Sequence, residues 1–96
     1  MVIWTPRARN DLKAIHDYIS QDAPINAKSV IRDILDKAAS INEHPYTGKV
    51  VSEFNDPNLR EVSAHSWRIV YHLRNQQVYI VTLIHKRRIV STVDLQ

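Results

Sequence analysis

The sequence predicts an α+β domain with a short N-terminal strand and a two-helix antiparallel hairpin packed on one face of an antiparallel β-sheet. Two observations support this fold class. Apolar residues recur with the helical period in two segments of the first half, and β-prone runs separated by turn residues fill the second half. With 96 residues, 44% of them apolar, the chain suffices for one modest core, so we expect residues 1–96 to form one domain.

The junction between the first strand and the first helix is marked by two residues. Residues 2–4 are β-prone; Thr5 is then expected to cap a helix, and Pro6 to take its first position, where a missing N–H costs nothing. The apolar stripe of this helix consists of Ala8, Leu12, Ile15 and Ile19.

A second helix is predicted to start around Asp22–Pro24 and to run to about Glu43, before Pro45 ends the pattern. A short turn joins it to the first helix, so the two should form an antiparallel hairpin. Its apolar stripe consists of Ala27, Val30, Ile31, Ile34, Leu35, Ala38 and Ile41.

The second half is expected to form the rest of the sheet. Gly48, the only glycine, is expected where a positive φ is required. The tail, residues 89–96, is expected to be a short helix or an irregular arm. The predicted strands cover residues 50–54, 59–64, 67–73 and 78–85, with turns at 55–58 and 74–77.

The hairpin of residues 67–85 should present two different faces. If residues 74–77 close a tight turn, Leu73 pairs with Val78 and the other antiparallel pairs follow. A cation and two imidazoles then recur on the face away from the helices, which suits a surface that binds something negatively charged. The helix-facing set is Trp67, Ile69, Tyr71, Leu73, Val78, Ile80 and Ile84, and the opposite set is Arg68, Val70, His72, Tyr79, Val81, Leu83 and His85.

Several classes of protein are excluded or disfavoured. Cysteine is absent, which excludes disulfide scaffolds and thiolate metal sites and fits a reducing cytoplasm. No secretory signal and no apolar run of roughly 20 residues is present, so we expect a soluble cytoplasmic protein without a membrane partner. No P-loop or dinucleotide motif occurs, and the histidines lack metal-ligand spacing, so we expect no metal and no cofactor. The histidines are His16, His44, His65, His72 and His85.

The positive charge is concentrated in the strand-rich part. Residues 1–56 hold seven Lys and Arg against eight Asp and Glu, whereas residues 57–96 hold six against two. This asymmetry favours an acidic partner, either nucleic acid or an acidic protein segment; the alternative is a solvated basic end without a partner. With one glycine, the chain would have to bind phosphate through guanidinium groups, as Arg60, Arg68, Arg87 and Arg88 would allow.

A set of positions between about Val2 and Arg88 forms a pattern in its order and spacing. These positions are Trp4-Thr5, Ala8, Asp11-Leu12, Ile15, Tyr18-Ile19, Pro24, Ala27, Pro45, Gly48, Leu59-Arg60, Trp67 to Tyr71 and His85 to Arg88. The pattern resembles the RelE/ParE toxin superfamily. The resemblance implies a type II toxin with the same α+β fold, which an antitoxin from an adjacent gene neutralises and which meets operator DNA only through the antitoxin complex.

The resemblance leaves two activities open. RelE-like members cut mRNA in the ribosomal A site, and ParE-like members poison DNA gyrase. Arg68 and Arg87 match arginines of RelE-like members, but Asp56 and Asn58 stand where RelE has lysines, and no tyrosine follows Tyr79. These departures remove a base and a stacking acid, so ParE-like inhibition of gyrase is the favoured interpretation.

A ribosome-dependent endoribonuclease remains the alternative, and a non-catalytic antitoxin-binding co-repressor is the third interpretation. For a nuclease, the resemblance implies Glu53, Arg68 and His85 as catalytic residues, with Arg87 as the second arginine. Structural roles compete: Arg68 can pair with Glu61, and His85 can be a strand-end histidine bonded to backbone. The residues expected to contact the target or the antitoxin are Arg60, Arg68, Lys86, Arg87 and Arg88.

Overall fold

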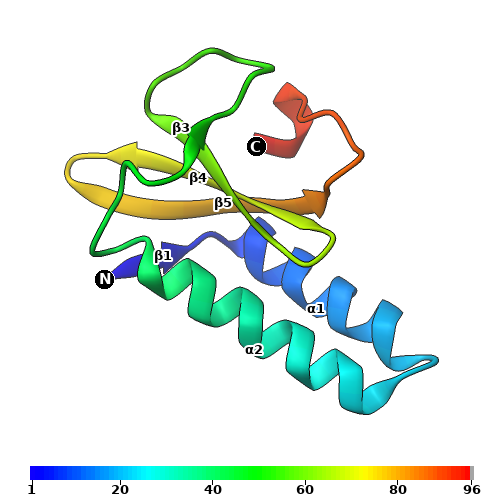
Figure 1. The fold of residues 1–96 in the computed structure, drawn as a ribbon. Coiled ribbons are helices and arrows are strands. Elements are labelled where there is room, and N and C mark those ends of the chain that lie inside the picture. Colours follow the sequence, from blue (N-terminus) through cyan, green and yellow to red (C-terminus); the bar gives the residue numbers. More distant parts are fainter. Residues whose placement is uncertain (96) are drawn as a thin grey trace.

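The computed structural model describes residues 1–95; Gln96, the last residue of the predicted C-terminal arm, lies outside the described residues. The two helices run side by side along one face of the sheet, and the C-terminal segment lies on the other side (Figure 1). The predicted α+β fold is confirmed. The elements are β1 (Val2–Trp4), α1 (Pro6–Ser20), α2 (Pro24–Ser40), β2 (Lys49–Val50), β3 (Leu59–Ala64), β4 (Trp67–Arg74), β5 (Gln77–His85) and the 3₁₀ turn η1 (Thr92–Leu95).

The five strands form one sheet in the order β1-β5-β4-β3-β2. The pairs β2–β3, β3–β4 and β4–β5 are antiparallel. β1 pairs with β5 in parallel, a detail that the sequence pattern did not predict. Among the described residues, no helix is both long and apolar enough to cross a membrane.

The helix starts follow the predicted signals. The Thr5 hydroxyl accepts a hydrogen bond from the Ala8 N–H at 3.2 Å, and Pro6 is the first residue of α1. α2 begins at Pro24, but Ala23 precedes it without a side-chain cap. α2 also ends at Ser40 rather than near Glu43. The chain beyond it makes tighter turn bonds, such as Ile41 N–H to the Ala38 carbonyl at 3.2 Å.

The main core, called here the helix-side core, lies between the helices and the sheet. It contains the predicted stripes in large part, although Leu35 is 42% exposed and so lies outside it. Burial of this apolar surface is the main stabilising term of the fold. The buried members are Ala8, Ile15, Val30, Ile34, Ala38, Ile41, Ile69, Tyr71, Val78, Ile80 and Leu83.

The β4–β5 hairpin has the predicted starting register. Leu73 pairs with Val78, and the strands extend one pair further, to Arg74 and Gln77. The turn is therefore only two residues long. Asn75 and Gln76 both have positive φ, 51° and 64°, as the two-residue hairpin turn that matches the strand twist requires.

A β-bulge changes the register in the middle of this hairpin. Tyr71 pairs with Ile80, whereas Val70 pairs with Thr82, so one extra residue is inserted on β5. Beyond the bulge, the predicted faces of β5 are wrong. Leu83 packs in the helix-side core and Ile84 packs on the other face, the reverse of the expected arrangement.

Asp11 of α1 holds this bulge in place. Its Oδ2 accepts hydrogen bonds from the Thr82 hydroxyl at 2.6 Å and from the Leu83 N–H at 3.1 Å. Asp11→Ala would leave two buried donors unpaired, so we expect it to lower the free energy of unfolding by about 2–3 kcal/mol. Urea denaturation measures this. Asp17→Ala on the exposed side of the same helix is the control and should change stability by less than about 0.5 kcal/mol; equal effects of the two would contradict the assignment.

The segment between α2 and β3 differs from the prediction in two respects. The strand expected over residues 50–54 is limited to β2, because the chain turns at once: the Phe54 and Asn55 N–H groups both bond to the Val51 carbonyl. Gly48 does not have a positive φ. It is needed for close approach, since a Cβ there would lie 2.7 Å from the Glu61 carbonyl and would overlap the Tyr71 hydroxyl.

Candidate functional site

Arg68 of β4 is the centre of an ion-pair cluster on the face away from the helices. Its Nε and Nη2 bind the two oxygens of Glu61 at 2.8 and 2.5 Å. Its Nη1 and Nη2 bind the two oxygens of Glu53 at 2.8 and 3.0 Å. Nη1 also donates to the Arg88 carbonyl at 2.7 Å. An arginine has five N–H donors, so this cluster of Arg68, Glu53 and Glu61 uses all of them.

The electrostatics of the Arg68 cluster favour the charged forms of Arg68 and Glu53. Hydrogen bonds from Arg68 lower the pKa of Glu53 from its ordinary 4.5 to about 2, against the opposing effect of burial; the Val90 N–H lowers it further. Hydrogen bonds to Glu53 and Glu61 raise the pKa of Arg68. The Arg68 side chain is only 10% exposed. The cluster therefore holds a guanidinium between two carboxylates beneath the surface.

Because the pKa of Glu53 is lowered in the folded state, the stability of the protein depends on pH. The folded-state pKa lies below the unfolded value, so ionised Glu53 stabilises the fold above pH 4.5, and this contribution is lost as the pH falls toward 2. Glu53→Gln should therefore be less stable than the native protein at neutral pH, with a difference that shrinks as the pH falls. Urea titrations over that pH range measure it. Exposed Glu43→Gln is the control, and a difference that does not depend on pH would refute the assignment.

The C-terminal segment closes over this face. The Val90 N–H donates to Glu53 Oε2 at 2.8 Å. Asp94, which is 2% exposed, accepts from the Ser91 N–H at 3.0 Å and pairs with Arg7 at 3.1 Å. Hydrogen bonding from Ser91 lowers the pKa of Asp94. Beneath the segment is a second apolar group, called here the tail-side cluster: Val51, Leu59, Val70, Ile84 and Val90.

Asp94 is a structural residue that the sequence reasoning missed. The signal for it was present, because Ser91 and Asp94 have the spacing of a capping box, in which a hydroxyl residue is followed three positions later by an acid. A short helix and an irregular arm were both expected for the tail. The structure has a short 3₁₀ turn there, η1, whose start is held by this pair.

His85 lies on the opposite face of the sheet from Arg68. Its ring meets the ring of Trp67 edge-on, with centroids 5.4 Å apart, on the helix side. Its Nδ1 accepts the Arg87 N–H at 3.2 Å. The structure thus brings Glu53 and Arg68 together but places His85 apart from them. The bulge is the cause, because it exchanges the faces to which the side chains at this end of β5 point.

Arg60 binds the chain on both sides of β2. Its Nε donates to the Pro57 carbonyl and its Nη1 to the Gly48 carbonyl, both at 2.8 Å. Its guanidinium also lies over the ring of Tyr46, 5.0 Å from the centroid. These contacts give Arg60 a clear role in holding the loop between α2 and β3.

Of the residues predicted to contact the target or the antitoxin, the exposed ones are Lys86, Arg87 and Arg88, called here the basic loop. The loop backbone is fixed by the Lys86 N–H to the Ser66 carbonyl at 2.8 Å and by the Arg88 N–H to the His85 carbonyl at 2.9 Å. The Arg88 side chain lies 3.4 Å from Asp94 and is still 60% exposed. The basic loop is a rigidly placed positive surface that an acidic partner can reach.

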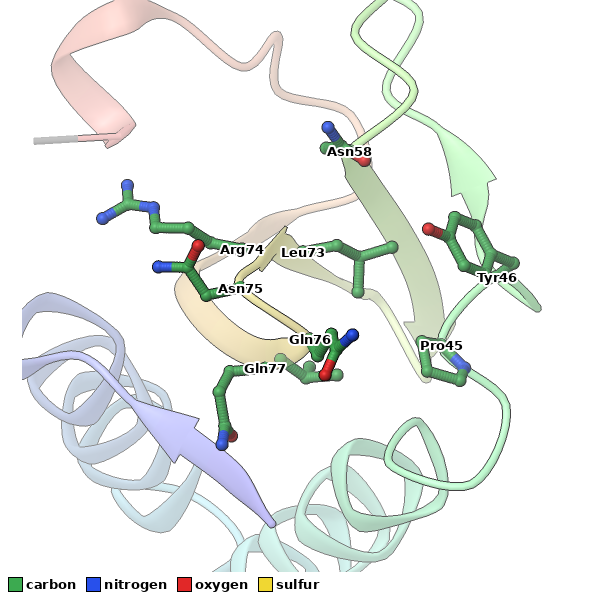
Figure 2. A pocket seen from close by; sticks show the side chains of 9 residues that line it. Pro45, Tyr46, Asn58, Leu73, Arg74, Asn75, Gln76 and Gln77 are labelled. Carbon is green, nitrogen blue, oxygen red and sulfur yellow. The ribbon is translucent and has the colours of Figure 1, made fainter.

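A hollow of about 390 Å³ lies at the other end of the hairpin, around the β4–β5 turn. Figure 2 shows Leu73 pointing toward Tyr46 across this hollow, with amide side chains around it. No carboxylate or histidine lines it, so it offers no acid–base pair. Within residues 1–95 there is also no cluster of three or more His, Cys, Asp or Glu residues able to hold a metal ion.

The chain forms a two-helix hairpin on a five-stranded sheet, with Arg68 in the central strand and the basic loop after the last strand. Residues 2–90 match the family model described as ParE toxin of type II toxin-antitoxin system, parDE. The chain belongs to this family and is a type II toxin of the RelE/ParE superfamily.

Individual relatives agree with this assignment. The chain is 35% identical over 89 residues to the protein named Toxin RelE2 of Caulobacter vibrioides, covering 92% of this chain and 97% of that one. Among solved structures it resembles a chain of the chromosomal ParDE system of P. aeruginosa, with a TM-score of 0.74, 18% identity and coverage of 88% and 92%. A chain of the YoeB-YefM complex of Staphylococcus aureus gives a TM-score of 0.56, 17% identity and coverage of 88% and 94%. At these identities the structural likeness establishes the fold.

Proposed function

We propose that this toxin is ParE-like and arrests growth by inhibiting DNA gyrase. The observation that carries the proposal is the complete internal use of Arg68, whose N–H groups all bond to Glu53, Glu61 or the Arg88 carbonyl. Cutting RNA requires a cation that is free to stabilise charge on the transferring phosphorus. An arginine bound in this way supplies none, which favours a toxin that acts by contact with a protein.

The remaining groups of the nuclease alternative give the same indication. Glu53, with its pKa near 2, is a weak base at neutral pH. His85 lies on the other face of the sheet, against Trp67. Arg87 is exposed, and its backbone N–H bonds to His85 Nδ1 on that other face, away from Glu53 and Arg68. These positions support a protein target over RNA cleavage.

The basic loop is the proposed contact with the target. Lys86, Arg87 and Arg88 are exposed and adjacent, on backbone that is anchored at both ends. Such a surface attracts an acidic patch and sets its orientation. Arg60 and Arg68 contribute indirectly in this proposal, by holding the loop before β2 and the segment after β5.

A cognate antitoxin is the proposed neutralising partner. The structural relatives named above are toxin–antitoxin systems, ParDE and YoeB-YefM. An acidic antitoxin segment on the basic loop would screen the charges that the target needs. We place the protein in the cytoplasm, and we assign operator DNA binding to the antitoxin complex.

Two assays run in parallel test the proposal. Purified toxin is added to DNA gyrase in a supercoiling assay, and to a translating ribosome mixture whose mRNA is then mapped by primer extension. We expect supercoiling to fall with toxin dose while the message stays intact. Ribosome-dependent cuts in the message with unaffected gyrase would overturn the proposal in favour of an mRNA interferase. No effect in either assay would favour the co-repressor alternative.

A further inference from the structure

A separate cleft opens on the helix side of the sheet, where the β3–β4 turn meets the end of α1 and the start of α2. Its volume is about 460 Å³, within the range of small-molecule sites. It contains two of the five histidines of the chain, and the proposed function uses neither. The lining residues of this histidine cleft are Tyr18, Ile19, Asn26, Val30, His65, Ser66, Trp67 and His85.

His65 is held in the cleft by a bond to α2. Its Nε2 lies 2.7 Å from Asp33 Oδ2, and because a carboxylate only accepts, the imidazole must donate there. Its φ is 55°, as the first position of the two-residue turn between β3 and β4 requires. The ring is therefore oriented from outside the cleft, and its Nδ1 is the atom left for a ligand.

His85 is oriented by two different contacts. Its Nδ1 accepts the Arg87 N–H at 3.2 Å, so in the neutral ring the proton lies on Nε2 and that atom is a donor. The edge-on contact with Trp67 fixes the ring plane. Like His65, His85 has one nitrogen engaged with the protein and the other available.

The composition of the cleft selects an anionic ligand with a flat or apolar body. None of the lining residues is acidic, although the Asp33 carboxylate binds His65 from outside the cleft. Asn26, Ser66 and Nε2 of His85 can donate hydrogen bonds, and Nδ1 of His65 can donate when that ring is protonated. Lys86 and Arg87 follow directly after His85 and are exposed, adding positive charge at this end of the sheet. The apolar lining, in contrast, includes an indole and a phenol ring, on which a base can stack.

We propose that the histidine cleft binds a nucleoside 5′-phosphate, with the base against Trp67 and Tyr18 and the phosphate at His65 and His85. The ligand can be a free mononucleotide or the 5′-phosphorylated end of a nucleic acid, which present the same group. This site is independent of whether gyrase is the target.

The test is a titration of the purified protein followed by nitrogen-15 NMR of the imidazole side chains. Adenosine 5′-monophosphate is the probe, with adenosine and inorganic phosphate added separately. We expect saturable shifts at His65 and His85 with the monophosphate, and weaker responses to either half alone. His44, exposed and outside the cleft, is the internal control. Absence of any shift, or equal shifts at His44, would overturn the proposal.

Matched variants locate the binding. His85→Asn and His65→Asn should each lower the affinity for the monophosphate by about tenfold, which corresponds to the loss of one hydrogen bond to a charged group. His44→Asn should leave the affinity unchanged. Asparagine tolerates the positive φ at position 65, so the turn is preserved. Tighter binding of a 5′-phosphorylated dinucleotide would identify a nucleic acid end as the source, and binding of the monophosphate alone would identify the free nucleotide. Unchanged affinity in both histidine variants would refute the site.

Discussion

Replacement of Arg68 by methionine is expected to lower the free energy of unfolding by about 3–5 kcal/mol, because removal of one partner leaves the other buried charges uncompensated. Glu61 is 4% exposed and Glu53 is held against the same guanidinium. Without Arg68, two carboxylates would face each other beneath the tail. Urea denaturation at neutral pH measures the loss.

A triple variant provides the control for this prediction. Arg68→Met combined with Glu53→Gln and Glu61→Gln removes all three charges together, so it should recover much of the stability that the single variant loses. If the single variant costs less than about 1 kcal/mol, the pairs contribute no more than exposed ones do, and the cluster is not held as described.

Loss of toxicity in an Arg68 variant does not by itself show that Arg68 is catalytic. An arginine that joins Glu53, Glu61 and the Arg88 carbonyl supports the backbone of the basic loop from beneath. An Arg68 variant that no longer arrests growth can therefore have lost its fold or its loop position, with no catalytic role involved. Only a variant whose stability has been measured can be used to assign a chemical function to this residue.

The sequence predicts the local elements of this fold well, and the reason is physical. Thr5 and Pro6 act through the N–H groups of their own helix, and the start of α1 depends on nothing further away. The Asn75–Gln76 turn likewise sets the Leu73–Val78 pair by its own geometry. Signals of this kind can be read from a short window of residues.

Two errors of prediction involve partners distant in sequence. The bulge in β5 is held by Asp11 of α1, which is 71 positions from Thr82, so no pattern within the hairpin reveals it. Gly48 is required by the Tyr71 hydroxyl, again from another element. The bulge also determines which residues share a site. It places His85 on the other face of the sheet from Arg68, whereas strict alternation along β5 would place both on one face.

The Arg68–Glu61 pair, by contrast, was within reach of the sequence. The two residues lie on consecutive predicted strands, 59–64 and 67–73, which pair in the structure so that the side chains of one face meet. Glu53 could be anticipated only by resemblance, since it comes from the turn after β2 and no strand register determines its position. The resemblance implies that Glu53 and Arg68 act together in catalysis, and the geometry shows an ion pair between them.

Reversal of charge in the basic loop should abolish growth arrest without unfolding the protein. In the Lys86→Glu/Arg87→Glu variant, an acidic target surface would meet like charge, which costs several kcal/mol and weakens binding by about a hundredfold or more. Both side chains are exposed, so the unfolding midpoint should stay close to the native value. Arg88 is left in place because it pairs with the buried Asp94.

The matched control is Lys28→Glu/Arg32→Glu on the exposed side of α2, which changes the net charge of the protein by the same amount. Growth after induction and inhibition of gyrase are measured for both variants. If only the loop variant is inactive, the position of the charge and not its total determines activity, as contact with a target requires. If both lose activity equally, nonspecific attraction of a basic protein is sufficient. A loop variant that arrests growth with native potency would place the target contact elsewhere on the molecule.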